Sequence, residues 1–252
     1  MHNRYIDFHC HILPGMDFDG TDHVRESVAM CKQLKSQGVA TVCATPHFYP
    51  WNEDVDAFLA RRDKALAVLQ AEECPVEIIP GAEVQIFQAL PECRVDKMCI
   101  GESNVVLFEM PRLPFQTWMI TSIENAVYKY ALTPVIAHIE RYGFTAEQLR
   151  KFAHIPNVVF QITVSELNHK RSLKMLDMVS SCGVPVVLGS DAHNMTSRAP
   201  QFDVIGEKTA EKAGLFNRQL KATQTIIENC LYAQLILENK IRTPMKTEVQ
   251  QQ

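Results

Sequence analysis

The sequence predicts an α/β protein folded as a parallel β/α barrel of the TIM type. Short apolar runs rich in β-forming residues alternate with longer segments of helical period, the pattern of parallel strands joined by crossover helices. Most of these runs lead into a histidine or a carboxylate. The length of 252 residues also suits one such barrel, which commonly uses about 200–250 residues as a single unit.

Seven apolar runs are the predicted strands. Each is short, is rich in Val or Ile, and is followed by polar or turn-forming residues. In chain order they are Tyr5–His9, Val39–Ala44, Val76–Pro80, Val105–Glu109, Pro134–His138, Val158–Ile162 and Val184–Gly189.

Helical segments lie between these strands. Their apolar residues recur at steps of three and four, as Val24, Val28 and Cys31 illustrate, and Gly38 and Gly183 stand where helix C-cap glycines are expected. The predicted helices are Thr21–Gln37, Val55–Glu72, Gln116–Tyr130, Ala146–Ala153, Ser172–Cys182, Asp203–Ala213 and Gln219–Glu238. We expect one domain over residues 1–245 and a disordered tail over residues 246–252.

Six of the seven predicted strands end in, or run directly into, a His, Asp or Glu. Because the C-terminal ends of all strands in a parallel barrel meet at one face, these side chains should converge there. They are His9, His11, His47, Glu83, Glu109, His138, Asp191 and His193.

This set predicts a metal centre. His9 and His11 project on the same side of an extended chain, and Asp191 and His193 repeat that spacing on the last strand. A lone His-x-His is more often a pair of surface or hydrogen-bonded histidines. The joint pattern is different, because buried imidazoles and carboxylates packed without cations would be costly.

The ligand types narrow the chemistry. Histidine and carboxylate donors without thiolate suit Mn²⁺, Zn²⁺ or Fe²⁺. The donors outnumber what one ion can use, so two or three divalent cations bridged by a shared carboxylate are expected. Because such sites activate water and clamp phosphate oxygens, phosphate-ester hydrolysis by a metal-bound hydroxide is the leading interpretation.

Composition excludes other classes. A formal net charge of −4 and a pI near 6.1 argue against a nucleic-acid binder. No apolar run approaches the ~20 residues of a membrane span, and the N-terminus lacks a signal-peptide core, so we expect a cytoplasmic protein without membrane insertion.

The eight scattered cysteines form no C-x-x-C pair and should be reduced. Cys10, between His9 and His11, should point away from the metals. A nucleophilic role for it is disfavoured, because no C-x₅-R loop follows.

The motifs resemble those of the polymerase-and-histidinol-phosphatase (PHP) superfamily. More narrowly, they resemble the bacterial manganese-dependent protein tyrosine phosphatases of capsule and exopolysaccharide operons. The opening motif is Asp7-Phe8-His9-Cys10-His11-Ile12-Leu13-Pro14-Gly15. The later motifs, in order, are Ala44-Thr45-Pro46-His47, Gly81-Ala82-Glu83, Phe108-Glu109-Met110-Pro111, Ala137-His138-Ile139-Glu140-Arg141-Tyr142 and Ser190-Asp191-Ala192-His193-Asn194.

The resemblance implies a distorted (β/α)7 TIM-like barrel with three metals, Mn²⁺ foremost. It assigns a first ion to His9, His11, Glu83 and Asp191, a second to Glu83, Glu109 and His138, and a third to an aspartate with His47 and His193. Arg141 and Arg198 match the arginines that present guanidinium groups to the substrate phosphate.

The chain departs from the family pattern after the Pro-Gly turn. Phe18 separates Asp17 from Asp19 where the family reads Asp-Asp-Gly. Asp19 fits the end of the motif, whereas Asp17 keeps the spacing from His11, so the choice between them as third-metal ligand stays open at this point.

The expected activity is hydrolysis of phosphotyrosine on protein, with the tyrosine-rich tail of a polysaccharide-assembly tyrosine kinase as the expected substrate. The alternative is a small-molecule phosphomonoesterase such as a histidinol-phosphate phosphatase. A regulatory module that has lost turnover is disfavoured by the complete ligand set. The sequence leaves the oligomeric state open.

Overall fold

The computed structural model describes residues 5–205, except the side chains of residues 168 and 170–173. The predicted helix Gln219–Glu238, most of the predicted helix Asp203–Ala213, the expected tail and the domain end at residue 245 lie outside the described residues.

Nine short strands form in the described part of the chain, all paired in parallel. They are β1 (Tyr5–Cys10), β2 (Val39–Ala44), β3 (His47–Phe48), β4 (Glu77–Pro80), β5 (Glu83–Gln85), β6 (Val105–Glu109), β7 (Thr133–Ile136), β8 (Val159–Thr163) and β9 (Val186–Gly189).

The helices agree with the predicted segments to within a few residues at each end. They are α1 (Val24–Ser36), α2 (Val55–Gln70), α3 (Thr117–Tyr130), α4 (Ala146–Phe152) and α5 (Lys170–Ser181). Asp54 caps α2 by accepting the backbone N–H groups of Asp56 and Ala57, and Thr145 caps α4 within a capping box. Gly38 and Gly183 have φ values of 91° and 70°, the left-handed conformation expected after a helix C-terminus.

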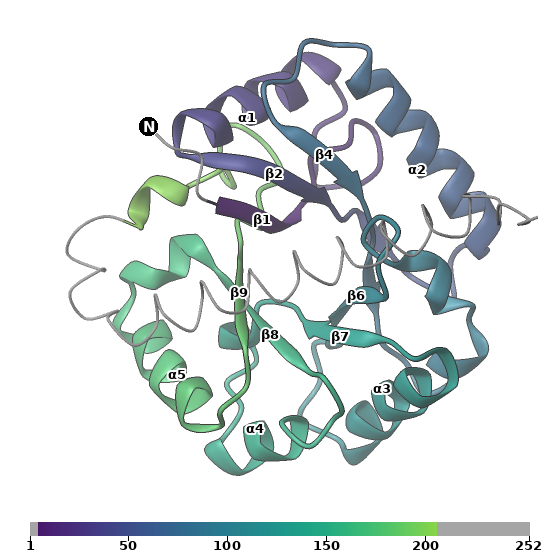
Figure 1. Ribbon diagram of the computed structural model, residues 1–252, viewed down its shortest axis with the longest axis vertical. Helices are drawn as coiled ribbons and strands as arrows, with labels where there is room; N and C mark the ends of the chain where they lie inside the picture. The colour runs from purple at the N-terminus through teal and green to yellow at the C-terminus, as the bar shows by residue number, and fades with distance from the viewer. Residues whose placement is uncertain (1–4, 206–252) are drawn as a thin grey trace, which may run out of the picture.

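The strands surround a central axis and the five helices lie outside them, as Figure 1 shows. The hydrogen-bonded order is β1-β2-β4 in one sheet and β3-β5-β6-β7-β8-β9 in the other. A parallel bridge between Cys10 and Ala192 joins the end of β1 to the segment after β9. The α/β barrel-like class predicted from the sequence is therefore confirmed.

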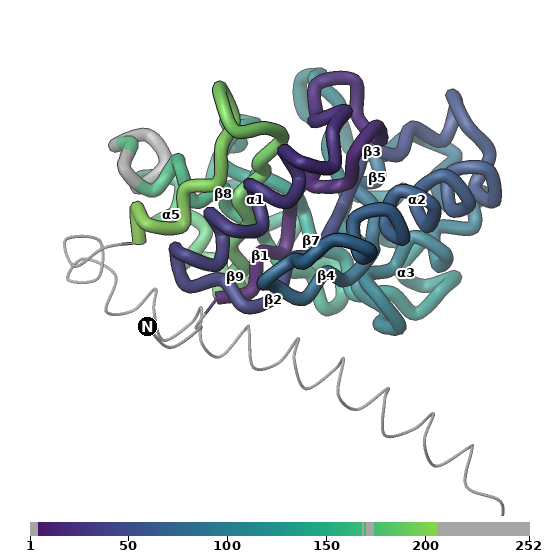
Figure 2. The backbone as a smooth tube through the Cα atoms, turned by 90° about the horizontal axis from the view of Figure 1, so that it is seen from above, coloured from purple at the N-terminus to yellow at the C-terminus, as the bar shows by residue number. Residues whose placement is uncertain are grey.

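Two strands were absent from the prediction. β3 and β5 are short continuations of β2 and β4 beyond Thr45-Pro46 and Gly81-Ala82, and Figure 2 shows them side by side toward one end of the barrel. Pro46 has no N–H and Gly81 is a weak strand former, so the sequence reads as though each strand stopped there. These two continuations carry His47 and Glu83 into the site.

The predicted C-terminal end of the strand Pro134–His138 was wrong. β7 stops at Ile136, and His138 adopts a left-handed backbone conformation with φ of 30°. The direction of the His138 side chain is therefore set by the turn that begins at His138, and not by the alternation of side chains along a strand.

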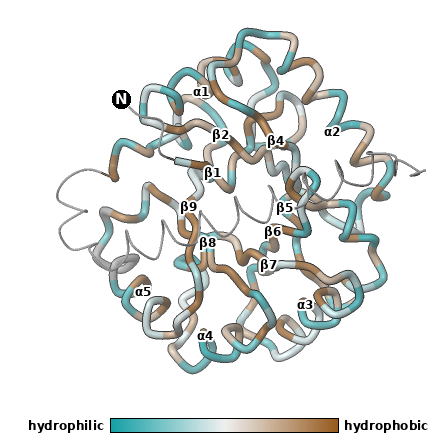
Figure 3. The backbone as a smooth tube through the Cα atoms, viewed as in Figure 1, coloured by the Kyte–Doolittle hydropathy of each residue, from teal (hydrophilic) through white to brown (hydrophobic). Residues whose placement is uncertain are grey.

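Apolar side chains from strands and helices form the core. Figure 3 shows hydrophobic segments along the strands and hydrophilic segments along the outer helices. Phe8, Leu107 and Val187 are fully or almost fully buried among the strands, while Phe58 and Phe152 pack from α2 and α4. Within the described residues, no helix is long and apolar enough to cross a membrane.

Candidate metal centre

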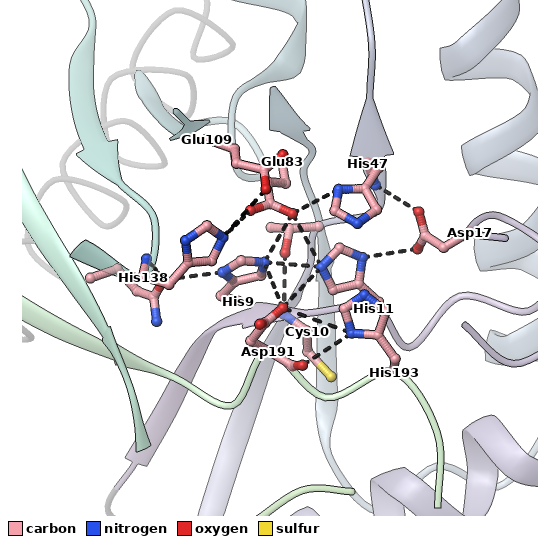
Figure 4. Close-up of polar contacts among 12 residues, drawn as sticks. His9, Cys10, His11, Asp17, His47, Glu83, Glu109, His138, Asp191 and His193 are labelled. Carbon is pink, nitrogen blue, oxygen red and sulfur yellow. Dashed lines mark hydrogen bonds and ion pairs between the residues drawn. The ribbon is translucent and has the colours of Figure 1, made fainter. Parts of the chain in front are cut away.

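Four imidazoles surround the carboxylate of Glu83 at the C-terminal ends of the strands, as Figure 4 shows. Glu83 Oε2 lies 3.3 Å from Nε2 of His9, 3.3 Å from Nε2 of His11 and 2.9 Å from Nδ1 of His47. Glu83 Oε1 lies 2.9 Å from Nε2 of His138, and Glu109 Oε1 lies 3.8 Å from the same nitrogen. One buried carboxylate therefore faces groups from several strands.

Strand pairing places these side chains. His47 and Glu83 are partners in the β3–β5 register, and Glu109 ends β6 beside Gln85 of β5. Gln85 Nε2 also donates to Glu109 Oε2 at 3.0 Å. The β3 and β5 continuations thus bring together donors that are distant in sequence.

Asp191 and His193 complete the cluster from the segment after β9. Asp191 Oδ1 lies 3.4 Å from Nε2 of both His9 and His11, and the His193 ring stacks on His11 with centroids 3.7 Å apart. Asp191 has a φ of 51°, a sparsely populated conformation for a non-glycine residue. Its N–H donates to the carbonyl of His9 at 2.7 Å, which holds this turn against β1.

Gln161 of β8 was not predicted as a site residue, because its strand lacks a histidine or carboxylate at its end. It is fully buried, and its Oε1 accepts the backbone N–H of His138 at 2.7 Å. The same oxygen lies 3.0 Å from His9 Nδ1, so His9 carries a proton on Nδ1 and directs Nε2 into the cluster. Gly189 makes this approach possible, since a Cβ there would lie 2.5 Å from His9 Cβ and 2.8 Å from Gln161 Nε2.

The two aspartates after β1 have different surroundings. Asp17 Oδ1 accepts the backbone N–H of His47 at 2.8 Å, and its Oδ2 lies 3.0 Å from His11 Nδ1. Asp19 Oδ1 lies 3.5 Å from His193 Nε2 and has no hydrogen-bond partner among the described residues. Asp17 therefore holds ligand-bearing segments, while Asp19 faces the cluster with a free oxygen.

Both predicted arginines reach the cluster. Arg198 donates from Nη2 to Asp191 Oδ2 at 2.6 Å and from Nη1 to Asp19 Oδ2 at 3.0 Å. Arg141 forms an ion pair with the same Asp191 oxygen and lies 4.0 Å from Glu140. Their side chains are 40% exposed for Arg141 and 32% for Arg198, so the guanidinium groups stand between the buried cluster and solvent.

The electrostatics of the cluster follow from burial and close charges. Burial alone would raise the pKa values of Glu83 and Asp191, but positive charge on His9 holds both well below their usual range. Burial and the neighbouring His11 lower the pKa of His193 to about 2. Burial and the charge of Glu83 raise the pKa of Glu109 to about 7. Glu83 and Asp191 are therefore ionised and His193 is neutral, which are the protonation states that metal binding requires, whereas Glu109 would have to release its proton on binding a metal.

Several donors in the cluster fit a cation better than a hydrogen-bond network. Glu83 Oε2 and His47 Nδ1 are buried and lie 2.9 Å apart, but neither atom has the geometry of a hydrogen bond with any described residue. Asp17 and Gln161 place protons on Nδ1 of His11 and His9, yet the two Nε2 atoms face each other at 3.0 Å. Two lone pairs that meet in this way need a proton or a cation between them.

The described part of the chain contains three overlapping sets of donor residues, and within each set the donor atoms lie within 4.8 Å of one another. They are His9, His11 and Glu83; His47, Glu83 and Glu109; and His11, His47 and His193. Their overlap is the arrangement that neighbouring ions with shared ligands require.

Cys10 lies outside this donor set. Its side chain is fully buried, its Sγ contacts the carbonyl of Ala192 at 3.7 Å, and burial raises the pKa of its thiol well above the usual value. A thiol of this kind is not an activated nucleophile. The seven cysteines in the described residues are all free.

A family model described as capsular polysaccharide synthesis, CpsB/CapC, matches residues 5–229. The chain belongs to this family. The tyrosine-protein phosphatase YwqE of Bacillus subtilis is 27% identical over 207 residues, covering 77% of this chain and 79% of YwqE. The tyrosine-protein phosphatase CpsB of Streptococcus agalactiae is 27% identical over 249 residues, covering 93% of this chain and 98% of its own.

Solved structures agree with this family assignment. A crystal structure from a study of YwqE from Bacillus subtilis and CpsB from Streptococcus pneumoniae, described as unique metal-dependent tyrosine phosphatases, matches with a TM-score of 0.67 and 26% identity. The match covers 85% of this chain and 95% of the other. A lactonase from Listeria monocytogenes, 11% identical with a TM-score of 0.53, shares the fold alone.

Proposed function

We propose that this protein is a metal-dependent phosphatase that hydrolyses phosphotyrosine on protein substrates. The observation that carries the proposal is the buried Glu83 carboxylate, which faces nitrogens of His9, His11, His47 and His138 at 2.9–3.3 Å. The names of the CpsB/CapC relatives support phosphotyrosine rather than a small phosphomonoester as the substrate.

The cluster would hold two to three divalent cations, with Mn²⁺ the leading candidate and Zn²⁺ or Fe²⁺ as alternatives. His9, His11, Glu83 and Asp191 would hold the first, and Glu83, Glu109 and His138 the second. Asp19, His47 and His193 would hold the third. When bound, such cations supply an activated water and polarise the phosphate oxygens.

The different surroundings of Asp17 and Asp19 support the choice of Asp19 as a ligand. Asp17 Oδ2 already accepts from His11 Nδ1, and Asp17 Oδ1 accepts the backbone N–H of His47. Asp19 Oδ1 is buried, makes no hydrogen bond with any described residue and lies 3.5 Å from His193 Nε2. Asp17 would instead fix the His11 ring, as outer carboxylates commonly do for metal-binding histidines.

Arg141 and Arg198 would bind the outer oxygens of the phosphate. Each guanidinium is anchored on Asp191 and partly open to solvent, so it can meet an anion arriving at the mouth. A planar guanidinium donates two parallel hydrogen bonds to a phosphoryl group, and its charge would oppose the charge that develops during phosphoryl transfer. His9, His11 and Glu83 are almost completely buried and exclude bulk water from the base of the site, which strengthens these interactions.

The deciding experiment is a substrate panel with Mn²⁺ added to metal-stripped protein. Phosphotyrosine peptides, phosphoserine peptides and histidinol phosphate would be compared by release of inorganic phosphate. We expect the highest kcat/KM on phosphotyrosine peptides and no release of phosphate without added metal. Preference for histidinol phosphate would favour the small-molecule alternative. We propose that the protein acts in the cytoplasm and that its physiological substrate is the tyrosine-rich tail of a tyrosine kinase of polysaccharide assembly, since the family is one of capsular polysaccharide synthesis.

A further inference from the structure

A cavity of about 400 Å³ opens directly beside the metal cluster. Asp17 and His47 belong both to the cluster and to the cavity wall. Phe18 and Tyr49 provide aromatic surface on the wall, and Met16 adds apolar surface. The cavity is therefore continuous with the place where a phosphate would bind.

Aromatic rings lead outward from the cluster on the Tyr49 side. The Tyr49 ring stacks on His47 with centroids 5.4 Å apart and an interplanar angle of 23°. Trp51 follows at 5.6 Å from Tyr49, and its side chain is half exposed. An aromatic face next to a candidate ligand can bind a flat ring, because stacked and tilted aromatic pairs attract each other.

Phe18 is the most exposed large hydrophobic residue among those described, at 90%. An ordered turn presents it: the N–H of Gly20 donates to the carbonyl of Asp17 at 3.2 Å, and Arg61 donates to the carbonyl of Met16 at 3.2 Å. The protein thus displays an aromatic ring at the mouth of the site without burying it in the fold.

The charged groups of the cavity wall are already paired. Arg61 forms two hydrogen bonds to Glu53, at 3.0 and 2.7 Å, and Asp17 is engaged by His11 and the His47 backbone. The remaining lining favours an uncharged, flat group over a second anion.

We propose that this cavity binds the aromatic ring of the substrate phosphotyrosine, with Phe18 and Tyr49 as specificity-determining residues. The inference rests on the proposed function and extends it. In an aryl phosphate the ring is bonded directly to the bridging oxygen, so with the phosphate on the cluster the ring must lie immediately outside it. An aliphatic phosphoester would place no ring there and would gain nothing from these residues.

The test is a binding comparison that needs no turnover. Phenylphosphonate and methylphosphonate carry the same anionic group, but only the first has a ring. Calorimetric titration of the Mn²⁺-reconstituted protein gives the ratio of their Kd values for the wild type, Phe18→Ala, Phe18→Tyr and Tyr128→Ala. Tyr128 is a matched control because it is also an exposed aromatic residue. It lies near the end of α3 that leads into the start of β7, whereas the site lies at the C-terminal ends of the strands.

The wild type should bind phenylphosphonate more tightly than methylphosphonate. Phe18→Ala should weaken phenylphosphonate binding about 2- to 10-fold and leave methylphosphonate binding unchanged. Phe18→Tyr, which keeps a ring, and Tyr128→Ala should resemble the wild type. Equal affinity of the wild type for both phosphonates, or equal weakening of both by Phe18→Ala, would overturn the inference. Failure of the proposed function would show separately, as absence of phosphotyrosine hydrolysis by the wild type.

Discussion

The floor of the candidate metal centre is buried and densely paired, whereas its rim is open to solvent. His9, His11 and Glu83 on the floor are no more than 1% exposed, and each contacts at least two other site residues. On the rim, Arg141 is held through an ion pair to Asp191, and Phe18 is almost fully exposed.

The buried floor and the open rim suit two different tasks, metal coordination and substrate selection. A rigid floor fixes donor atoms within a few tenths of an ångström, which is what coordination of several ions demands. An open rim can vary its side chains without loss of the core, so substrate selection can be adjusted there. Substitutions on the floor should therefore change metal content, and substitutions on the rim should change turnover or substrate preference with metals retained.

Glu83→Ala should give the largest effect. Glu83 faces four imidazoles, so its removal would leave at least two proposed ions without a shared ligand. We expect less than half the wild-type metal content and a loss of activity beyond about 10³-fold, since removal of a single charge-stabilising donor already costs about 10²–10³. Elemental analysis and phosphate release measure both. His193→Ala, which removes a ligand of one proposed ion, is the comparison variant, and equal metal loss in the two would contradict a bridging role for Glu83.

Arg141→Lys tests the rim. Lysine keeps the charge but lacks the planar fork that binds two phosphate oxygens, so kcat on a phosphotyrosine peptide should fall about 10²–10³-fold at full metal content. Arg112→Lys is a matched control, because Arg112 is exposed. A turnover near that of the wild type would make Arg141 a structural partner of Asp191 and leave Arg198 as the principal phosphate anchor.

Gln161→Leu should have an intermediate effect. The effect should be on metal affinity, because Gln161 supports residues of the buried floor. Leucine has a similar size but cannot accept hydrogen bonds from His9 Nδ1 and the His138 backbone. Loss of such a supporting group typically weakens metal affinity about 10- to 100-fold. Activity titrated against free Mn²⁺ should shift by that factor and recover at saturating metal, with exposed Gln70→Leu as the control. Unchanged metal affinity would show that His9 is oriented by other contacts.

Sequence and structure agree best where strand periodicity positions a residue. The predicted convergence of strand-end residues depends only on the parallel direction of the strands. In the structure, His9 Nε2 lies 3.3 Å from a Glu83 oxygen and 3.4 Å from an Asp191 oxygen. Their role as metal ligands stays a prediction that the experiments above address.

Features set by tertiary contacts could not be predicted in this way. Gln161 carries no charge and no metal-site motif, and its role depends on the neighbouring β9, where Gly189 lets it approach His9. The left-handed turn at His138 is fixed by the Gln161 hydrogen bond to its backbone. The spacing from His11 favours Asp17 and the end of the motif favours Asp19, and only their different partners in the folded chain distinguish them.

Cys10→Ser should have the smallest effect, although Cys10 lies between two proposed ligands. Its thiol faces the core and the Ala192 carbonyl rather than the donor cluster, so turnover on a phosphotyrosine peptide should stay within about twofold of the wild type. Serine buries a hydroxyl in an apolar site, which commonly costs about 1–3 kcal/mol when poorly paired, so the Tm should fall by several degrees. A chelator should abolish activity in both proteins, and added Mn²⁺ should restore it. If the serine variant lost all turnover while its metal content and fold were intact, a cysteine nucleophile would replace the metal-based mechanism. Retained turnover with a lowered Tm would instead show that a residue between two floor ligands serves packing alone.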